Sequence, residues 1–156
     1  MAEEESRNLN NNYLRFKIAK GFKKRIVGKV DPKLIPIYKQ RIYKETTEII
    51  GSGFVDYFLI VEDCLSWAVS QGIYIGPGRG SVGGSLVAYI LGITMIDPIR
   101  SGLIWERFFN TGRTDSPPDI DMDIEDARRH EVINYLKIKY GDDCVCSITT
   151  FGRLAM

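Results

Sequence analysis

Three aspartates alternate with apolar residues in the run Pro118–Ile124, and this spacing is the strongest chemical signal in the sequence. Side chains alternate across an extended segment, so Asp119, Asp121 and Asp123 are predicted to share one face while the apolar residues between them enter the core. Carboxylates crowded on one face repel each other and raise their own pKa values unless a cation compensates them. Mg²⁺ prefers hard oxygen ligands, so the run predicts a divalent metal site. The alternative is a solvent-facing edge strand whose acids prevent aggregation.

A glycine-rich stretch, Gly76–Ser85, follows a short apolar segment that starts at Ile73. A glycine-rich turn between a strand and a helix exposes backbone N–H groups at the positive end of the helix dipole, which suits phosphate oxygens. Arg79 adds a forked cation there and Ser81 adds a hydroxyl donor. The stretch lacks the lysine of a P-loop and the later acidic residue of a dinucleotide fold. The alternative is a packing turn that needs glycine only for its backbone conformation.

Together the two motifs predict metal-dependent phosphoryl transfer. Two carboxylates that bridge a pair of Mg²⁺ ions about 4 Å apart can activate an attacking hydroxyl and stabilise the departing pyrophosphate. The glycine-rich stretch would hold the β and γ phosphates of the nucleotide.

The elements that position these motifs follow from apolar periodicity and from capping residues. The predicted helices and strands are a helix of about 15 residues that ends near Gly51, a helix capped by Asp56 that ends before Gly72, short helices at 85–91 and 103–109, a helix between Asp126 and Gly141, and strands at 73–75, 118–124 and 145–149. These elements mix helices with short strands.

Length and composition indicate one ordinary globular domain of 156 residues, with 44% apolar and 26% charged residues and a net charge of +1. Residues 1–12 are polar and are predicted to form a disordered tail. Residues 13–36 form a basic lead-in, in which Arg15–Lys29 carries seven cations and no acid. This lead-in is either a contact for a phosphate backbone or a solvated helix face. Three unpaired cysteines and no membrane-spanning run predict a cytoplasmic protein.

The motifs resemble a known family in order and in spacing. The matching segments are Gly53–Val61, Gly76–Tyr89, Leu91–Thr94 with Asp97-Pro98, Glu106–Phe108, Pro118–Asp123 and Ile148–Gly152. They closely resemble the palm of the alpha subunit of bacterial DNA polymerase III, over about residues 37–156. The resemblance implies an α/β (α+β) fold class: an incomplete palm domain with the nucleotidyltransferase fold of polymerase beta, in which a mixed sheet carries the acids and helices pack against it.

The resemblance also assigns roles to individual residues. The first two aspartates of the acidic run, Asp119 and Asp121, would be catalytic metal ligands, with Asp123 as an adjacent candidate ligand. Arg79, Gly80 and Ser81 would hold the incoming triphosphate. The predicted nucleotide-binding set is completed by Gly84 and Ser85.

By this resemblance the chain is part of a DNA-directed DNA polymerase that uses Mg²⁺, a deoxynucleoside triphosphate and primer–template DNA. The family's third catalytic aspartate, its fingers and its thumb are expected to lie outside these residues. We therefore expect the chain alone to be inactive and to need a complementary polymerase chain or the remaining polymerase domains. The alternative is a degenerate, non-catalytic palm that binds nucleotide, DNA or a polymerase subunit. A self-sufficient small nucleotidyltransferase is the weakest hypothesis, because no later strand offers another acid.

Overall fold

Five α-helices, joined by short turns, make up most of the computed structural model, which describes residues 2–110 and 117–146. The helices are α1 (Ala2–Arg25), α2 (Ile35–Gly51), α3 (Val55–Ser70), α4 (Leu86–Leu91) and α5 (Arg129–Tyr140). Single 3₁₀ turns lie at Pro32–Leu34, Gly80–Gly84, Trp105–Arg107, Asp126–Arg128 and Asp142–Cys144. No helix in these residues is long and apolar enough to cross a membrane.

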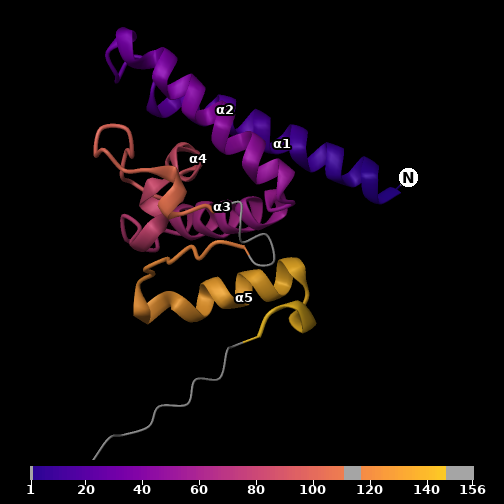
Figure 1. Ribbon diagram of the computed structural model, residues 1–156. Helices are drawn as coiled ribbons and strands as arrows, with labels where there is room; N and C mark the ends of the chain where they lie inside the picture. Colours follow the sequence, from indigo (N-terminus) through magenta and orange to yellow (C-terminus); the bar gives the residue numbers. More distant parts are fainter. Residues whose placement is uncertain (1, 111–116, 147–156) are drawn as a thin grey trace, which may run out of the picture.

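The helices form a stack in which α3 lies between the α1–α2 pair and α5 (Figure 1). The main core lies among α1, α2, α3 and α4. Large, fully buried side chains fill it, among them Tyr38, Phe58 and Trp105. A second, smaller core of Cys64, Ala68, Ile73 and Val132 lies between α3 and α5. The acidic segment runs between these two helices in Figure 1. It therefore lies beside both cores.

The predicted mixed sheet is wrong. Within residues 2–110 and 117–146 the backbone forms no strand, and only two isolated antiparallel bridges occur, Ile75 with Ile124 and Arg79 with Asp121. The ladder stops because Pro77 has no N–H to donate and Gly78 and Gly80 have positive φ angles of 91° and 71°. The described part of the domain is therefore helical.

Most helix positions were predicted well. Helix α2 ends at Gly51, α3 ends at Ser70, and α4 is capped by Ser85 and closed by Gly92 in the left-handed conformation. Gly141, with a φ of 102°, ends α5 as expected. These predictions succeeded because caps and terminating glycines are local signals.

Other local predictions were wrong. Helix α1 covers residues 2–12, where a disordered tail was predicted, and 103–109 contains only the 3₁₀ turn Trp105–Arg107. Asp56 does not cap α3; it accepts a hydrogen bond from the Asn10 side chain instead. Val145 and Cys146 form no strand, and the rest of the predicted strand 145–149 lies outside the described residues. The predicted boundary between the basic lead-in, which ends at residue 36, and the palm segment, which starts at residue 37, stays a prediction.

Candidate functional site

The glycine-rich stretch and the acidic segment lie side by side in antiparallel pairing. The backbone N–H of Gly76 donates to the carbonyl of Asp123 at 2.9 Å, and the N–H of Glu125 donates to the carbonyl of Tyr74 at 3.0 Å. The second bridge pairs Arg79 with Asp121. The structure thus brings together the two motifs that the sequence separates by about 40 residues.

Two glycines are required for this close approach. A Cβ atom at Gly76 would lie 2.8 Å from the Cβ of Asp123, which is closer than real side chains come. At Gly80 a Cβ would lie 3.0 Å from the Asp121 carboxylate, and the φ of 71° favours glycine in any case. The glycines therefore let the stretch pack directly against the acids.

The acidic segment alternates as predicted. Asp119, Asp121 and Asp123 are exposed, while the apolar residues between them are half-buried and pack against the two cores. The alternation is confirmed although the segment belongs to no sheet. Extended backbone alone gives the two-residue period.

Arg79 lies between two of the aspartates. Its Nε donates to Oδ1 of Asp123 at 3.1 Å, and its Nη2 is 3.6 Å from Oδ1 of Asp121. The exposed fractions of the three side chains are 62%, 56% and 46%. Exposed ion pairs contribute only about 0.2–1 kcal/mol, so Arg79 can exchange these partners for others at little cost.

Asp119 is placed differently from its two neighbours. It makes no hydrogen bond or ion pair within the described residues. The half-buried Tyr57 of α3 lies nearby, and the pKa of its hydroxyl is raised. Burial raises this pKa most, and the charges of Asp119 and Asp121 add to the rise. A hydrogen bond with the backbone of Ile120 acts in the opposite direction. Tyr57 thus connects α3 to the acidic segment through the backbone of Ile120, the residue after Asp119.

Two open cavities share Ser81 in their linings. One, of about 310 Å³, extends from Ser81 to Asp119 along Phe108. The other, of about 620 Å³, is lined by Gly80, Ser81 and the exposed Arg107. Arg107 also lines the first cavity, and its side chain makes no hydrogen bond or ion pair in the part of the chain that the structure describes. An unpaired arginine and a hydroxyl beside an open cavity suit an anionic ligand.

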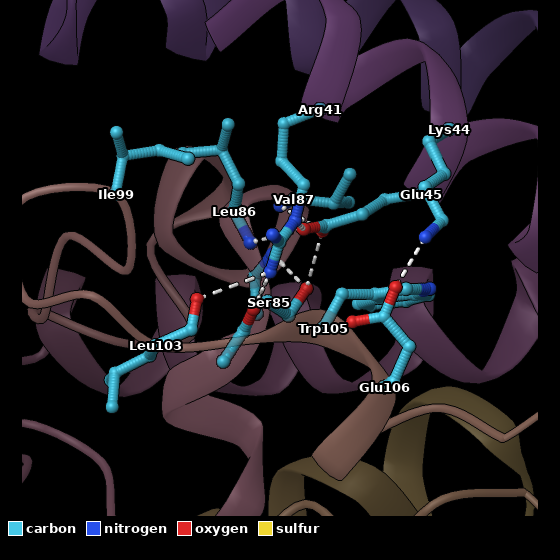
Figure 2. Close-up of polar contacts among 12 residues, drawn as sticks. Arg41, Lys44, Glu45, Ser85, Leu86, Val87, Ile99, Leu103, Trp105 and Glu106 are labelled. Carbon is cyan, nitrogen blue, oxygen red and sulfur yellow. Dashed lines mark hydrogen bonds and ion pairs between the residues drawn. The ribbon is translucent and has the colours of Figure 1, made fainter. Parts of the chain in front are cut away.

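Ser85 faces away from these cavities and supports the loop from behind. Figure 2 shows Glu45 of α2 at the centre of a polar cluster in which Arg41 and Ser85 point toward it. The carboxylate accepts hydrogen bonds from the Ser85 hydroxyl at 3.0 Å and from the N–H groups of Leu86 and Val87 at 3.0 and 2.9 Å. Glu45 therefore caps the N-terminus of α4 from another helix.

The same cluster holds Gly84. Arg41 donates to the Gly84 carbonyl at 2.8 Å, and a Cβ at Gly84 would lie 2.6 Å from the carbonyl oxygen of Ile104. Burial raises the pKa of the Glu45 carboxyl above its ordinary value. The hydrogen bonds from Val87, Leu86 and Arg41 lower this pKa and offset only part of the rise. The structure thus places Gly84 and Ser85 in the buried support of the loop, where Gly84 also lines the larger cavity, while Arg79, Gly80 and Ser81 are exposed.

Residues 12–156 match the family described as the bacterial DNA polymerase III alpha NTPase domain. The chain belongs to this family. It is 54% identical over 114 residues to the DNA polymerase III subunit alpha of Saccharopolyspora erythraea, covering 73% of this chain and 10% of that protein. The same subunit is 54% identical over 117 residues in Mycobacterium tuberculosis strain H37Rv, with 75% and 10% covered. In Staphylococcus aureus strain MRSA252 it is 51% identical over 118 residues, with 76% and 11% covered.

The resemblance to the DNA polymerase III alpha subunit is therefore confirmed as a family relationship. The chain spans about a tenth of the length of these relatives. The relatives' name describes a DNA polymerase as a whole. The predicted residues Ile148–Gly152 lie within the matched family segment but outside the described residues.

The donor set at the acidic segment fits a divalent cation only as a partial site. Within the described residues no group of three or more His, Cys, Asp or Glu side chains is placed to hold a metal ion together. Asp119 and Asp121 still offer exposed carboxylate oxygens on one face, the type of ligand that Mg²⁺ prefers. Arg79 pairs with Asp123 at 3.1 Å and more loosely with Asp121 at 3.6 Å. Two carboxylates with water would leave further positions open for other ligands.

Four contributors to this region were missed from the sequence: Arg41, Glu45, Tyr57 and Arg107. The i, i+4 spacing of Arg41 and Glu45 indicates an ion pair on one helix face. No spacing rule connects Glu45 to Ser85, because they lie 40 residues apart and meet only through tertiary packing. Arg107 belongs to a segment that matched the family motif, and its position beside Ser81 emerges only from the fold.

Proposed function

We propose that this chain supplies part of the nucleotidyl-transfer site of a DNA-directed DNA polymerase in DNA replication. Arg79, Gly80 and Ser81 would bind the triphosphate of an incoming deoxynucleotide, with Arg107 as an additional cation. Asp119 and Asp121 would hold Mg²⁺. The observation that carries the proposal is the antiparallel pairing that places Arg79 against Asp121, beside cavities lined by Ser81 and Asp119.

The residues have distinct tasks in this proposal. Mg²⁺ would neutralise phosphate charge and lower the pKa of the attacking hydroxyl. Gly80 allows the backbone to approach the phosphates without a side chain in the way. Arg79 would leave the aspartates and form charge-assisted hydrogen bonds with phosphate oxygens. The carboxylates would then be free for the metal, so metal and nucleotide binding favour each other.

The remaining parts of the reaction would come from elsewhere in the polymerase. Primer–template DNA and further metal ligands would be contributed or held by a complementary polymerase chain or by the remaining polymerase domains. The described residues contain no group of three metal ligands, so the proposal assigns the further ligands to those other parts. The proposal includes a cytoplasmic location, which cysteine usage predicted.

Metal binding by the full 156-residue chain tests the proposal. We expect weak Mn²⁺ binding, measured by water proton relaxation, that is lost in the double variant Asp119→Asn, Asp121→Asn. The matched control is Asp143→Asn, which removes an exposed carboxylate in the turn after α5 and is expected to leave binding unchanged. Equal Mn²⁺ binding by wild type and double variant would refute the metal assignment. A wild type that binds nucleotide but no metal would favour the degenerate, non-catalytic module.

A further inference from the structure

A second open cavity of different character lies between α1 and α2, away from the acidic segment. Both helices pack against α4, and the space left between them is a groove of about 410 Å³. Its apolar lining includes Ile18 and Phe22 from α1 and Ile42 from α2. No residue of this groove lines the cavities beside Ser81. The groove is therefore a separate surface from the proposed nucleotide site.

A buried polar group lines the groove without a partner. Thr46 of α2 is 5% exposed, and its hydroxyl makes no hydrogen bond within the described residues. A threonine within a helix commonly bonds the carbonyl three or four residues earlier. A buried hydroxyl without a partner is unfavourable, and a small shift of Thr46 that lets a ligand supply a polar partner would relieve this cost.

The rim of the groove is positively charged. Arg15, Lys23 and Lys39 line it, all three are exposed, and none makes an ion pair or side-chain hydrogen bond in the described part of the chain. No acidic residue lines the groove. Unpaired cations around an apolar floor are complementary to a ligand with one apolar face and acidic flanks.

We propose that this groove docks an acidic amphipathic helix of another protein chain. Apolar residues spaced at i, i+3, i+4 and i+7 would enter the floor between α1 and α2, and carboxylates beside them would face the three rim cations. A nucleic-acid backbone satisfies the rim but leaves the floor of Ile18, Phe22 and Ile42 unused, so a helix fits the surface better. The inference is independent of nucleotide binding.

Selection from a peptide library tests this proposal with the full chain. The library contains helical peptides with leucine fixed at i, i+3, i+4 and i+7 and random residues elsewhere, and affinities are measured by fluorescence anisotropy. We expect the selected peptides to be enriched in Asp and Glu. The double variant Lys23→Glu, Lys39→Glu should weaken their binding about tenfold or more. Lys24→Glu is the matched control, because Lys24 is exposed on α1 but does not line the groove.

Two further variants separate the floor from the rim. Ile42→Glu should abolish peptide binding while circular dichroism shows that the helices persist. Thr46→Val replaces the unpaired hydroxyl with a methyl group; we expect the free chain to become more stable and the selected peptides to bind less tightly. If Thr46→Val binds the selected peptides as tightly as wild type does, the Thr46 hydroxyl does not contribute to peptide binding.

Three outcomes would overturn the proposal. They are failure to select any peptide, enrichment of Lys and Arg at the random positions, and equal affinity of the selected peptides for wild type and the double variant. A single-stranded DNA 20-mer forms the last arm. If the DNA bound and lost affinity in the double variant while no peptide did, the rim would be a nucleic-acid contact.

Discussion

Two clusters of charge lie on either side of the glycine-rich stretch, and they differ in burial rather than in chemistry. Behind the stretch, Glu45 is fully buried and accepts hydrogen bonds from Arg41, Ser85 and two backbone N–H groups. In front, Arg79 contacts Asp121 and Asp123 through exposed ion pairs of 3.6 and 3.1 Å. In the first cluster the Glu45 carboxylate has a hydrogen-bond donor at both oxygens. In the second cluster the described residues leave part of the Arg79 guanidinium and of the two carboxylates open to solvent.

The difference in burial separates support from binding. A buried carboxylate must keep its partners, because losing one leaves an unpaired charge in a medium of low dielectric constant. An exposed ion pair loses little when water, a metal ion or a phosphate replaces one partner. We therefore infer that the rear cluster fixes the loop and that the front cluster exchanges partners when a ligand binds.

The largest expected effect concerns the front cluster in primer extension. The chain alone is expected not to extend a primer, and a complementary chain that supplies the rest of the polymerase is expected to restore extension. In the restored assembly Asp121→Asn should lower the rate by more than about a hundredfold, because a displacement of about 1 Å at the reacting atoms already costs about that much. The measurement is the rate of single-nucleotide incorporation.

Two results would change this view. Extension by the 156-residue chain alone, abolished by Asp121→Asn, would establish a self-sufficient nucleotidyltransferase. A complementary chain that associates but restores nothing would favour the non-catalytic binding module. Asp143→Asn should leave the restored rate unchanged.

Substitution in the rear cluster should instead have a large effect on the stability of the fold. Glu45→Ala removes the acceptor for Arg41, Ser85 and the first N–H groups of α4, and we expect a loss of about 3 kcal/mol in the free energy of unfolding. Urea denaturation measures this loss. Asp121→Asn, in the front cluster, should change the same quantity by less than about 0.5 kcal/mol. Similar losses for both variants would remove the distinction between the clusters.

Much of the helical part of the fold could be predicted from the sequence, because its signals are local. Ser85 and Gly92 mark the two ends of α4, and Gly141 marks the end of α5. The mixed sheet, which the family resemblance implied, was wrong, and so was the acidic strand predicted from alternation. Alternation reports an extended backbone but does not show that a neighbouring strand exists. Here Pro77 and two positive-φ glycines limit the pairing to isolated bridges.

At the candidate site the sequence predicted the alternation of the acidic segment but not the contacts that its residues make. The exposed face of Asp119, Asp121 and Asp123 follows from a period of two residues. The position of Arg79 against the aspartates could not be predicted, because it depends on the antiparallel approach of segments about 40 residues apart. Glu45 was missed for the same reason, since no local signal links α2 to the start of α4.

Arg79→Ala should separate the two ligands that the front cluster is proposed to bind. Loss of a charge-assisted hydrogen bond is worth about 1.5–3 kcal/mol, so nucleotide affinity should fall by at least about tenfold. Mn²⁺ affinity should not fall, because Asp121 and Asp123 lose a competing cation. Arg100→Ala, an exposed arginine outside both cavities, is the control. Equal nucleotide affinities of wild type and Arg79→Ala in a titration would indicate that the glycine-rich stretch is a packing turn and does not bind phosphate.

The smallest effect is expected at a charge of intermediate exposure, Asp63 of α3, which ties α5 to the fold. Its carboxylate accepts hydrogen bonds from Lys139 at 2.5 Å, from Tyr135 at 2.9 Å and from Tyr140 at 3.1 Å. Burial raises the pKa of Asp63, but these hydrogen bonds outweigh it and leave the pKa below its ordinary value. The folded state therefore favours the ionised form.

The sign of the pH dependence follows from this shift. A carboxyl group whose pKa is lower in the folded state contributes its full stabilisation above its unfolded pKa of about 3.9, and the contribution is lost as pH falls through the lower, folded value. Asp63→Asn should cost about 1 kcal/mol at pH 6 and progressively less below pH 4. Urea denaturation monitored by tryptophan fluorescence measures this, because Trp67 stacks on Tyr135 with ring centroids 4.3 Å apart. A cost that is the same at pH 3 and pH 6 would show that packing of α5, rather than the charge of Asp63, holds the helix in place.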